Sequence, residues 1–345
     1  MKYKRITAAL LTWVLVLSVA ITACDANTNT SNTADNNTGA ANANPGANPN
    51  VNAEFTVVCS IFPQYDWVRE VLGERYDVFN VSYLADSGVD SHSFAPSVAQ
   101  IARVSSADLF IYTGGKSDGW AENISRDSNK LNLNLIDVLG DDVLIFGNFC
   151  SDDCNEDHDH EKAQEGEAAD EHIWVSLRHT MTVVSAIGVA LSELDPAHAG
   201  LYSSNADEYI AKLSVLDKQY QQAVDAANVT TLVFADRFPF RYLMEDYGLT
   251  YYAAFQGCSA ETEASFSTIV SLANRINQLG LEVVMVTETS DKSIANTVIN
   301  STDAKNQRIL VLDSMKMVLP NDVQNGVTYL SIMESNLEVL REALS

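Results

Sequence analysis

Short blocks of hydrophobic residues alternate along this chain with segments of helical periodicity. The apolar blocks at 56–61, 78–84 and 109–112 predict buried strands, and apolar residues in the segments between them recur at three- and four-residue steps. Pro63 is placed to begin the first helix and Gly73 to end it. The second half repeats the alternation, with predicted strands at 232–235, 250–253, 283–287 and 309–312. This order predicts an α/β fold with mostly parallel sheets flanked by helices.

The segment after Asp195 has a helical pattern over residues 196–228. At 1.5 Å per residue, such a helix is roughly 45 Å long, which is enough to run along two lobes. Residues 54–345 are too many for one average domain, so we expect an N-terminal lobe at 54–195 and a C-terminal lobe at 229–345, joined by this helix. Ligands of open α/β sheets bind at the carboxyl ends of the strands, which predicts a site in the cleft between the lobes.

The amino terminus has the pattern of a bacterial export signal. Residues 1–23 combine early lysine and arginine residues with an apolar run, and the sequence Ile21-Thr-Ala-Cys24 resembles a lipobox in which the cysteine is lipidated. Residues 24–53 are almost entirely small or polar, as in a flexible tether. We therefore expect a protein outside the cytoplasmic membrane, attached to the membrane by a lipid anchor.

Acidic residues greatly outnumber basic ones, with 46 Asp and Glu against 21 Lys and Arg and a formal net charge of −25. This balance excludes nucleic acid as a partner, because proteins that bind it need positive surfaces. A strongly negative surface instead favours encounter with cations and keeps a protein soluble.

The acidic loop at 151–172 concentrates three of the six histidines of the chain. His158 and His160 form a His-x-His pair among carboxylates, and both side-chain types bind first-row divalent metals. We interpret the loop as an auxiliary metal-collecting segment. Cys150 and Cys154 at its base either form a disulfide in an oxidising compartment or join the two histidines in an auxiliary zinc site.

Three metal-compatible residues fall on separate loops at the predicted cleft. His92 lies on the loop that leaves a predicted strand, and His172 directly precedes Ile173-Trp174-Val175. Asp313 directly follows the predicted strand at 309–312. Two imidazoles and a carboxylate suit Zn²⁺, and Mn²⁺ and Fe²⁺ are weaker candidates for such a site.

From Glu54 onward, the chain resembles the zinc- and manganese-binding lipoproteins of bacterial ABC transporters, in particular the zinc-uptake branch. The segments that carry the resemblance are Gly88-Val-Asp-Ser-His-Ser-Phe-Ala-Pro96, Asp170-Glu-His-Ile-Trp-Val-Ser-Leu177, Leu194-Asp-Pro196, Tyr247-Gly-Leu249, Leu312-Asp-Ser314 and Tyr329 to Asn336. The resemblance implies two lobes joined by a rigid helix, with a metal ion between them. It implies His92 and His172 as ligands from the N-terminal lobe and Asp313 as the acidic ligand from the C-terminal lobe.

One position departs from the pattern of that family. Where the family commonly has a histidine or glutamate, ten residues before the Tyr-Gly-Leu segment, this chain has Arg237. Arginine has no lone pair to offer a metal. The open alternatives are that Asp236 or Glu288 supplies an oxygen, that water completes the site, or that Arg237 neutralises Glu261 or Glu263.

The resulting expectation is a monomeric binding protein that captures Zn²⁺ and delivers it to an ABC permease. Two other classes are open: a binder of a metal chelate such as haem or a siderophore, and a secreted zinc-dependent hydrolase. The chain has neither a His-Glu-x-x-His motif nor a Gly-x-Ser-x-Gly motif, so no catalytic motif favours the hydrolase.

Overall fold

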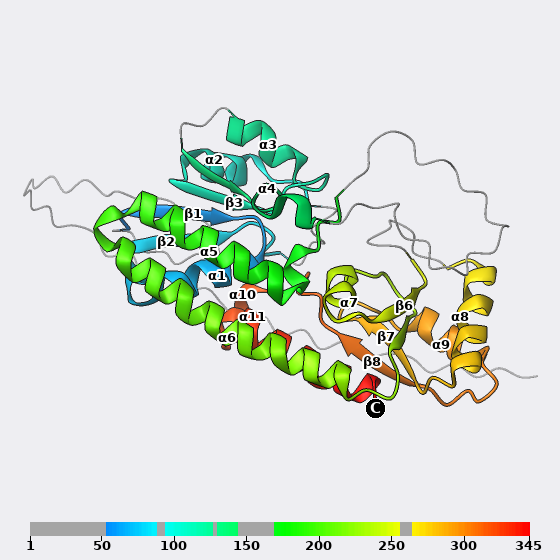
Figure 1. The fold of residues 1–345 in the computed structure, drawn as a ribbon. Helices are drawn as coiled ribbons and strands as arrows, with labels where there is room; N and C mark the ends of the chain where they lie inside the picture. Colours follow the sequence, from blue (N-terminus) through cyan, green and yellow to red (C-terminus); the bar gives the residue numbers. More distant parts are fainter. Residues whose placement is uncertain (1–52, 88–93, 127–129, 144–168, 256–263) are drawn as a thin grey trace, which may run out of the picture. The chain divides into compact units, whose positions relative to one another are not determined.

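The computed structural model describes residues 53–87, 94–126, 130–143, 169–255 and 264–345 (Figure 1). The predicted signal peptide, nearly all of the tether and most of the acidic loop lie outside these ranges. Several residues singled out in the sequence also lie outside them: Cys24, His92, Cys150, Cys154, His158, His160, Glu261 and Glu263. No helix in the described ranges is both long enough and apolar enough to cross a membrane.

The N-terminal lobe is built on a four-stranded parallel sheet. Its strands are β1 (Phe55–Cys59), β2 (Phe79–Tyr83), β3 (Leu109–Tyr112) and β4 (Leu131–Asn134), in the spatial order β2-β1-β3-β4. The chain order reverses between β1 and β3. The carboxyl ends of these two strands therefore form the position at which open α/β sheets bind ligands.

Helices connect these strands and cover the sheet. They are α1 (Phe62–Leu72), α2 (Val98–Ser106), α3 (Gly119–Arg126), α4 (Leu135–Leu139) and α5 (Leu177–Leu194), with short 3-10 helices η1 (Gly73–Val78), η3 (Gly140–Asp142) and η4 (Ile173–Val175). As predicted, Pro63 lies in the first turn of α1, and Gly73 ends that helix with a φ of 53°, which L side chains rarely adopt. The hydroxyl of Ser97 accepts the N–H of Gln100 and thereby fixes the start of α2.

The C-terminal lobe repeats the same sheet topology. Its strands are β5 (Thr231–Phe234), β6 (Thr250–Ala253), β7 (Val283–Thr287) and β8 (Arg308–Leu312), all parallel, in the order β6-β5-β7-β8. Its helices are α7 (Arg241–Tyr247), α8 (Phe266–Leu279), α9 (Ser293–Asn300), α10 (Pro320–Gln324) and α11 (Tyr329–Ala343). The predicted α/β fold with two parallel sheets is confirmed.

A long helix joins the two lobes. It is α6 (Ala199–Asp225), preceded by the 3-10 turn η5 (Pro196–His198), and it packs along α5 and α11 (Figure 1). The sequence pattern predicted this helix with boundaries that extend a few residues further at each end. The buried residues of α6 include Tyr209, Leu213, Leu216 and Tyr220, which recur at three- and four-residue steps.

The largest hydrophobic cluster runs through both lobes. It contains Val57 of β1, Leu213 of α6, Phe234 of β5 and Leu337 of α11. Two smaller clusters lie on the outer faces of the sheets, one under α2 and α3 and the other under α8 and α9. Because the lobes share one core, a wide separation of the lobes would expose apolar surface and is energetically unfavourable.

Three buried carboxyl groups have raised pKa values, so we expect the free energy of unfolding of the metal-free protein to increase as the pH falls from 7.5 to 5. Desolvation raises the pKa of Asp66, Asp118 and Asp246 to about 6 each, against an ordinary value of 3.8. An acid with a raised pKa binds protons more tightly in the folded state, so its stabilising contribution is present at low pH and is lost as the pH rises through 6. The buried imidazole of His179, whose pKa is lowered by desolvation, acts in the opposite direction.

We expect a net gain on the order of 2 kcal/mol in the free energy of unfolding between pH 7.5 and 5. Urea unfolding in the presence of a chelator measures it. An Asp66→Asn variant is the control, because its stability should vary less with pH. A lower urea midpoint at pH 5 than at pH 7.5 would contradict the prediction.

Candidate metal centre

His172 lies in a buried turn directly before η4. Its side chain is 1% exposed, and its Nδ1 atom is 2.7 Å from Oδ1 of Asp170, which also accepts the backbone N–H of His172 at 3.1 Å. An ionised carboxylate only accepts hydrogen bonds, so Nδ1 carries the proton and the lone pair is on Nε2. Protein histidines that bind metals are commonly held in this way by a carboxylate. The turn therefore presents His172 in the tautomer that a metal requires.

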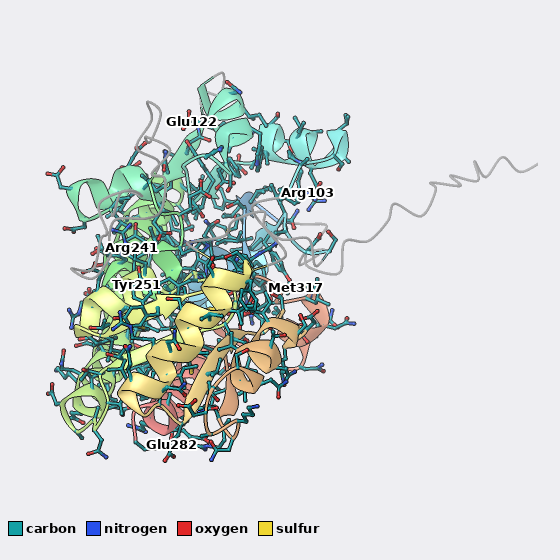
Figure 2. All side chains as sticks on the ribbon, turned by 90° about the vertical axis from the view of Figure 1, so that its right-hand side faces the viewer. Arg103, Glu122, Arg241, Tyr251, Glu282 and Met317 are labelled. Atoms are coloured by element: carbon teal, nitrogen blue, oxygen red, sulfur yellow. The ribbon has the colours of Figure 1, made fainter. Side chains whose placement is uncertain are left out.

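Asp170 is itself held by the C-terminal lobe. Its side chain is fully buried, and its backbone oxygen accepts the hydroxyl of Tyr242 at 2.7 Å. Arg241 and Tyr251 lie near each other in the same part of that lobe (Figure 2), and the charges of Arg241 and Asp170 both influence the pKa of Tyr251, which burial raises. The orientation of His172 therefore depends on residues from both lobes.

A glycine turn supports the other side of the His172 segment. Gly114 and Gly115 have φ values of 90° and 78°, which allow a tight turn between β3 and α3. A Cβ atom at Gly115 would lie 2.6 Å from the carboxylate of Glu171. That carboxylate accepts the N–H of Ser117 at 2.7 Å. The side chain of Asp118 accepts the backbone N–H groups of Thr113 and Gly114. The turn thus approaches Glu171 closely and fixes the residue next to His172.

Asp313 begins the loop that follows β8. Its backbone N–H and carbonyl are both hydrogen-bonded to the side chain of Asn336 on α11, and its Oδ1 accepts the N–H of Met315 at 2.7 Å. Burial and the nearby charge of Glu288 raise the pKa of Asp313 to about 6. A partly buried carboxyl beside a second carboxylate is an arrangement that a bound cation would stabilise.

Glu288 holds this loop in place. Its two carboxylate oxygens accept the backbone N–H of Ser314 at 2.8 Å, the hydroxyl of the same serine at 2.9 and 3.0 Å, and the N–H of Lys316 at 3.2 Å. These donors give Glu288 a structural task in the Asp313 loop. Its role as a metal ligand stays a prediction.

Asp236 is the other candidate from the C-terminal lobe. One of its oxygens accepts the N–H of Arg237 at 2.7 Å, and the other accepts the N–H and hydroxyl of Thr287 at 3.0 and 2.8 Å. These bonds connect the loop after β5 to the end of β7. Asp236 is therefore well fixed at the carboxyl edge of its sheet, and its role as a ligand also stays a prediction.

Hydrogen bonds between the lobes bring the His172 turn to the Asp313 loop. The indole Nε1 of Trp174 donates to the backbone oxygen of Ser314 at 2.8 Å, and the hydroxyl of Tyr329 donates to the backbone oxygen of Trp174 at 2.8 Å. The hydroxyl of Tyr83 in β2 donates to the backbone oxygen of Val318 at 3.1 Å. Two of the three predicted ligands thus lie on segments that contact each other directly.

A narrow crevice lies at this junction. The residues that line it come from the carboxyl ends of β1, β2 and β8 and from η4: Ile61, Phe62, Ala85, Trp174, Met315, Lys316 and Val318. Ala85 belongs to the loop that leads towards His92, so the described part of that loop starts at the crevice. Within the described ranges, no three His, Cys, Asp or Glu side chains form a metal-binding group. His92, the third predicted ligand, lies outside those ranges.

Two features of the site were missed by the reasoning from sequence. One is the role of Asp170 as the carboxylate that orients His172, for which the Asp-x-His spacing was an available signal. The other is the bond from Trp174 to Ser314, which joins residues 140 positions apart and has no local signal. Cys59 at the end of β1 is a free thiol with a fully buried side chain.

Comparisons with known proteins agree on one family. The family model described as "Zinc-uptake complex component A periplasmic" matches residues 57–343. The chain is 28% identical over 291 residues to the zinc-binding protein AdcA of Streptococcus pyogenes serotype M1, covering 83% of this chain and 55% of that protein. It is 25% identical over 288 residues to the high-affinity zinc uptake system protein ZnuA of Bacillus subtilis, covering 84% of this chain and 87% of that protein.

The fold is shared with solved structures. The Zn(II)-bound ZnuA-like domain of Streptococcus pneumoniae AdcA is 25% identical, with a TM-score of 0.66, and the match covers 84% of this chain and 98% of that domain. The chain spans only about 55% of the length of the AdcA protein of S. pyogenes. The similarity to AdcA therefore concerns its zinc-uptake-type domain and not the rest of that protein.

Proposed function

This chain belongs to the zinc-uptake complex component A family, and we propose that it captures Zn²⁺ outside the cytoplasmic membrane and delivers the ion to an ABC permease. The observation that carries this proposal is the buried His172, oriented by Asp170, in a turn that is hydrogen-bonded to the loop of Asp313. A buried imidazole with a fixed tautomer, in a turn bonded to the loop of a carboxyl group whose pKa is raised, is suited to binding a divalent cation.

The proposed ligands are His92, His172 and Asp313. Two nitrogens and one or two carboxylate oxygens are typical of zinc, and Asp236, Glu288 or a water molecule would complete the coordination. The same ligand types also bind Mn²⁺ and Fe²⁺, but Zn²⁺ is bound more tightly in the usual order of affinities. The similarity to a zinc-binding protein and to a Zn(II)-bound domain supports zinc as the cargo.

The segments outside the described ranges complete the proposal. The export signal at 1–23, lipidation at Cys24 and the tether at 24–53 would place the protein at the outer face of the membrane within reach of a permease. His158 and His160 in the acidic loop would raise the local concentration of zinc near the main site.

The contacts between the lobes support a small conformational change during loading and release. Trp174 bonds to Ser314, Tyr83 bonds to Val318, and the backbone N–H of Tyr329 in α11 donates to Asp66 in α1 at 2.8 Å. A wide hinge opening would break these bonds and expose the shared core. We therefore propose that local shifts of loops release the ion, and not a large separation of the lobes.

A zinc titration at several pH values tests the proposal. Zinc requires neutral imidazole and ionised carboxylate, and protons compete for these groups as the pH falls through about 6.5 for histidine. Protonation of Asp313, with its pKa near 6, acts in the same direction. We expect tight binding of one ion at pH 7.5 and a loss of affinity of at least tenfold per pH unit below roughly 6.

The measurement uses metal-free protein and a competing zinc indicator that is calibrated at each pH. Mass spectrometry of the zinc-loaded protein under native conditions gives the number of bound ions. Equal affinity at pH 7.5 and 5.5 would refute histidine ligation, and an organic adduct in place of a bare ion would favour a chelate as the cargo.

A further inference from the structure

The two lobes place one helix each in equivalent positions. Both sheets have the same strand order, and in both the second strand of the chain is an edge strand followed by a helix: α2 follows β2 and α8 follows β6. The chain leaves each parallel strand at its carboxyl end, so α2 and α8 both begin on the side of the carboxyl edges of their sheets. The crevice beside the metal centre is lined from the same edges.

The first residue of each of these helices is a large, exposed hydrophobic side chain. Val98 begins α2 and is 85% exposed, and Phe266 begins α8 and is 82% exposed. These are the two most exposed large hydrophobic side chains in the described part of the chain. Each follows a serine that caps its helix, Ser97 or Ser265. The same exposed feature therefore occurs once in each lobe.

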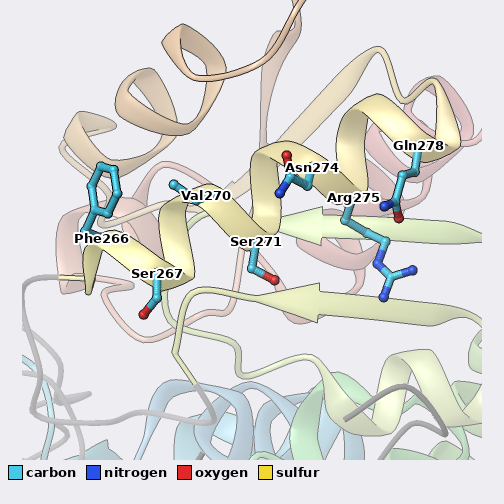
Figure 3. Close-up of a pocket in the computed structure, with 7 residues that line it drawn as sticks. All are labelled: Phe266, Ser267, Val270, Ser271, Asn274, Arg275 and Gln278. Atoms are coloured by element: carbon cyan, nitrogen blue, oxygen red, sulfur yellow. The ribbon is translucent and has the colours of Figure 1, made fainter. Parts of the chain in front are cut away.

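Both helices also lack acidic residues. The chain has 46 Asp and Glu among 345 residues, yet α2 and α8 contain none, and each has a single arginine, Arg103 (Figure 2) and Arg275. On α8, one largely exposed face (Figure 3) carries Phe266, Ser267, Val270, Ser271, Asn274, Arg275 and Gln278. In a strongly acidic protein, these two helices carry no carboxylate of their own and one positive charge each.

We propose that the acid-free faces of α2 and α8 are a paired docking surface for the permease, with Val98 and Phe266 as the central contact of each half. This inference rests on the proposed function. A membrane protein concentrates its Lys and Arg residues on the cytoplasmic side, so its outer face is poor in positive charge. A binding protein with a formal charge of −25 approaches such a face with least repulsion through surfaces that carry no carboxylate.

The presence of one such exposed hydrophobic residue in each lobe also supports a permease as the partner. A permease with two equivalent halves would offer two similar receptor surfaces, one for each lobe. Exposed aromatic and aliphatic side chains in a neutral surround are typical centres of protein interfaces, where a few residues provide most of the binding energy. A second copy of this chain is a less suitable occupant, because both partners would then be strongly negative.

The test measures uptake of radioactive zinc in host cells whose own copy of the gene is removed. The cells express the full chain as wild type, as the Val98→Ser/Phe266→Ser double variant, or as a Val189→Ser/Val215→Ser control. Val189 on α5 and Val215 on α6 are 59% and 57% exposed and lie outside the proposed surface. The docking variant is expected to reduce zinc uptake by about tenfold, with each single change reducing it less, while the control variant leaves it unchanged.

Two further readouts separate the alternatives. The zinc affinity of the purified docking variant should equal that of the wild type, since neither residue is a proposed ligand. A photoreactive phenylalanine analogue at position 98 or 266 should form a crosslink to a permease subunit in intact cells. Uptake at the wild-type level in the docking variant, an equal loss in the control, or a crosslink to a second copy of the chain would overturn the inference. Failure of the wild-type chain to restore uptake would instead refute the proposed function, and the docking inference with it.

Discussion

A His172→Ala variant is expected to lose tight binding of Zn²⁺, with a dissociation constant raised by more than about 100-fold. Loss of a residue that only orients a metal ligand already costs roughly 10–100-fold in affinity, and His172 is proposed to be the ligand itself. The imidazole is buried and bonded to Asp170, so alanine removes both the proposed ligand atom and the bond that orients it. Competition with a zinc indicator at pH 7.5 measures the change, and circular dichroism checks that the variant is folded.

The matched control replaces His158 and His160 in the acidic loop. We expect this double variant to keep one tight site while it loads more slowly or binds fewer ions in total, because the loop is proposed to collect metal and not to hold it. Two outcomes would contradict this assignment of roles. Tight zinc binding could survive in His172→Ala, or it could disappear when only His158 and His160 are replaced.

A Glu288→Ala variant is expected to lower the free energy of unfolding by about 2–4 kcal/mol. The change removes the acceptor for three donors in the Asp313 loop, two of them on the fully buried Ser314, and a buried donor without a partner costs about 1–3 kcal/mol. Zinc affinity should fall as well, because the loop that positions Asp313 loosens. Urea unfolding of the metal-free protein and a zinc titration measure the two effects.

A Glu288→Gln variant distinguishes the two roles that the sequence left open. Glutamine keeps one acceptor oxygen, so it should restore much of the stability if Glu288 mainly holds the loop, and zinc affinity should recover with it. If Glu288 is a metal ligand, glutamine should restore stability while zinc affinity stays low. An Asp313→Asn variant is the comparison, since it should lose affinity with a smaller loss of stability than Glu288→Ala.

Much of the fold could be predicted from local patterns. Strand β3 has the predicted boundaries, and the helix from Pro63 to Gly73 is bounded by residues whose backbone preferences are strong. Strand β4 was missed because its sequence, Leu131-Asn-Leu-Asn134, is only half apolar and lies at the sheet edge. Helix α10 was missed because five residues with a single buried side chain give no clear period.

Part of the candidate site could also be predicted from local features of the sequence. Residue type and position in the chain indicated His172 and Asp313, because imidazole and carboxylate at strand or turn ends are chemically suited to metals. The same reasoning could not separate a ligand from a carboxylate that holds a loop. Glu288 and Asp236 have the same functional group as Asp313, and their hydrogen bonds to Ser314 and Thr287, which lie 26 and 51 residues away, could not be predicted from local sequence.

The sequence by itself determined the alternation of strands and helices, the acidic character of the chain and the residue types available to bind a cation. These properties depend on local periodicity and on side-chain chemistry, which can be read without coordinates. The tertiary structure decided that the lobes share one core, that Asp170 orients His172 and that Trp174 joins the His172 turn to the Asp313 loop. Those features depend on contacts between segments far apart in the chain, and no local pattern specifies such contacts.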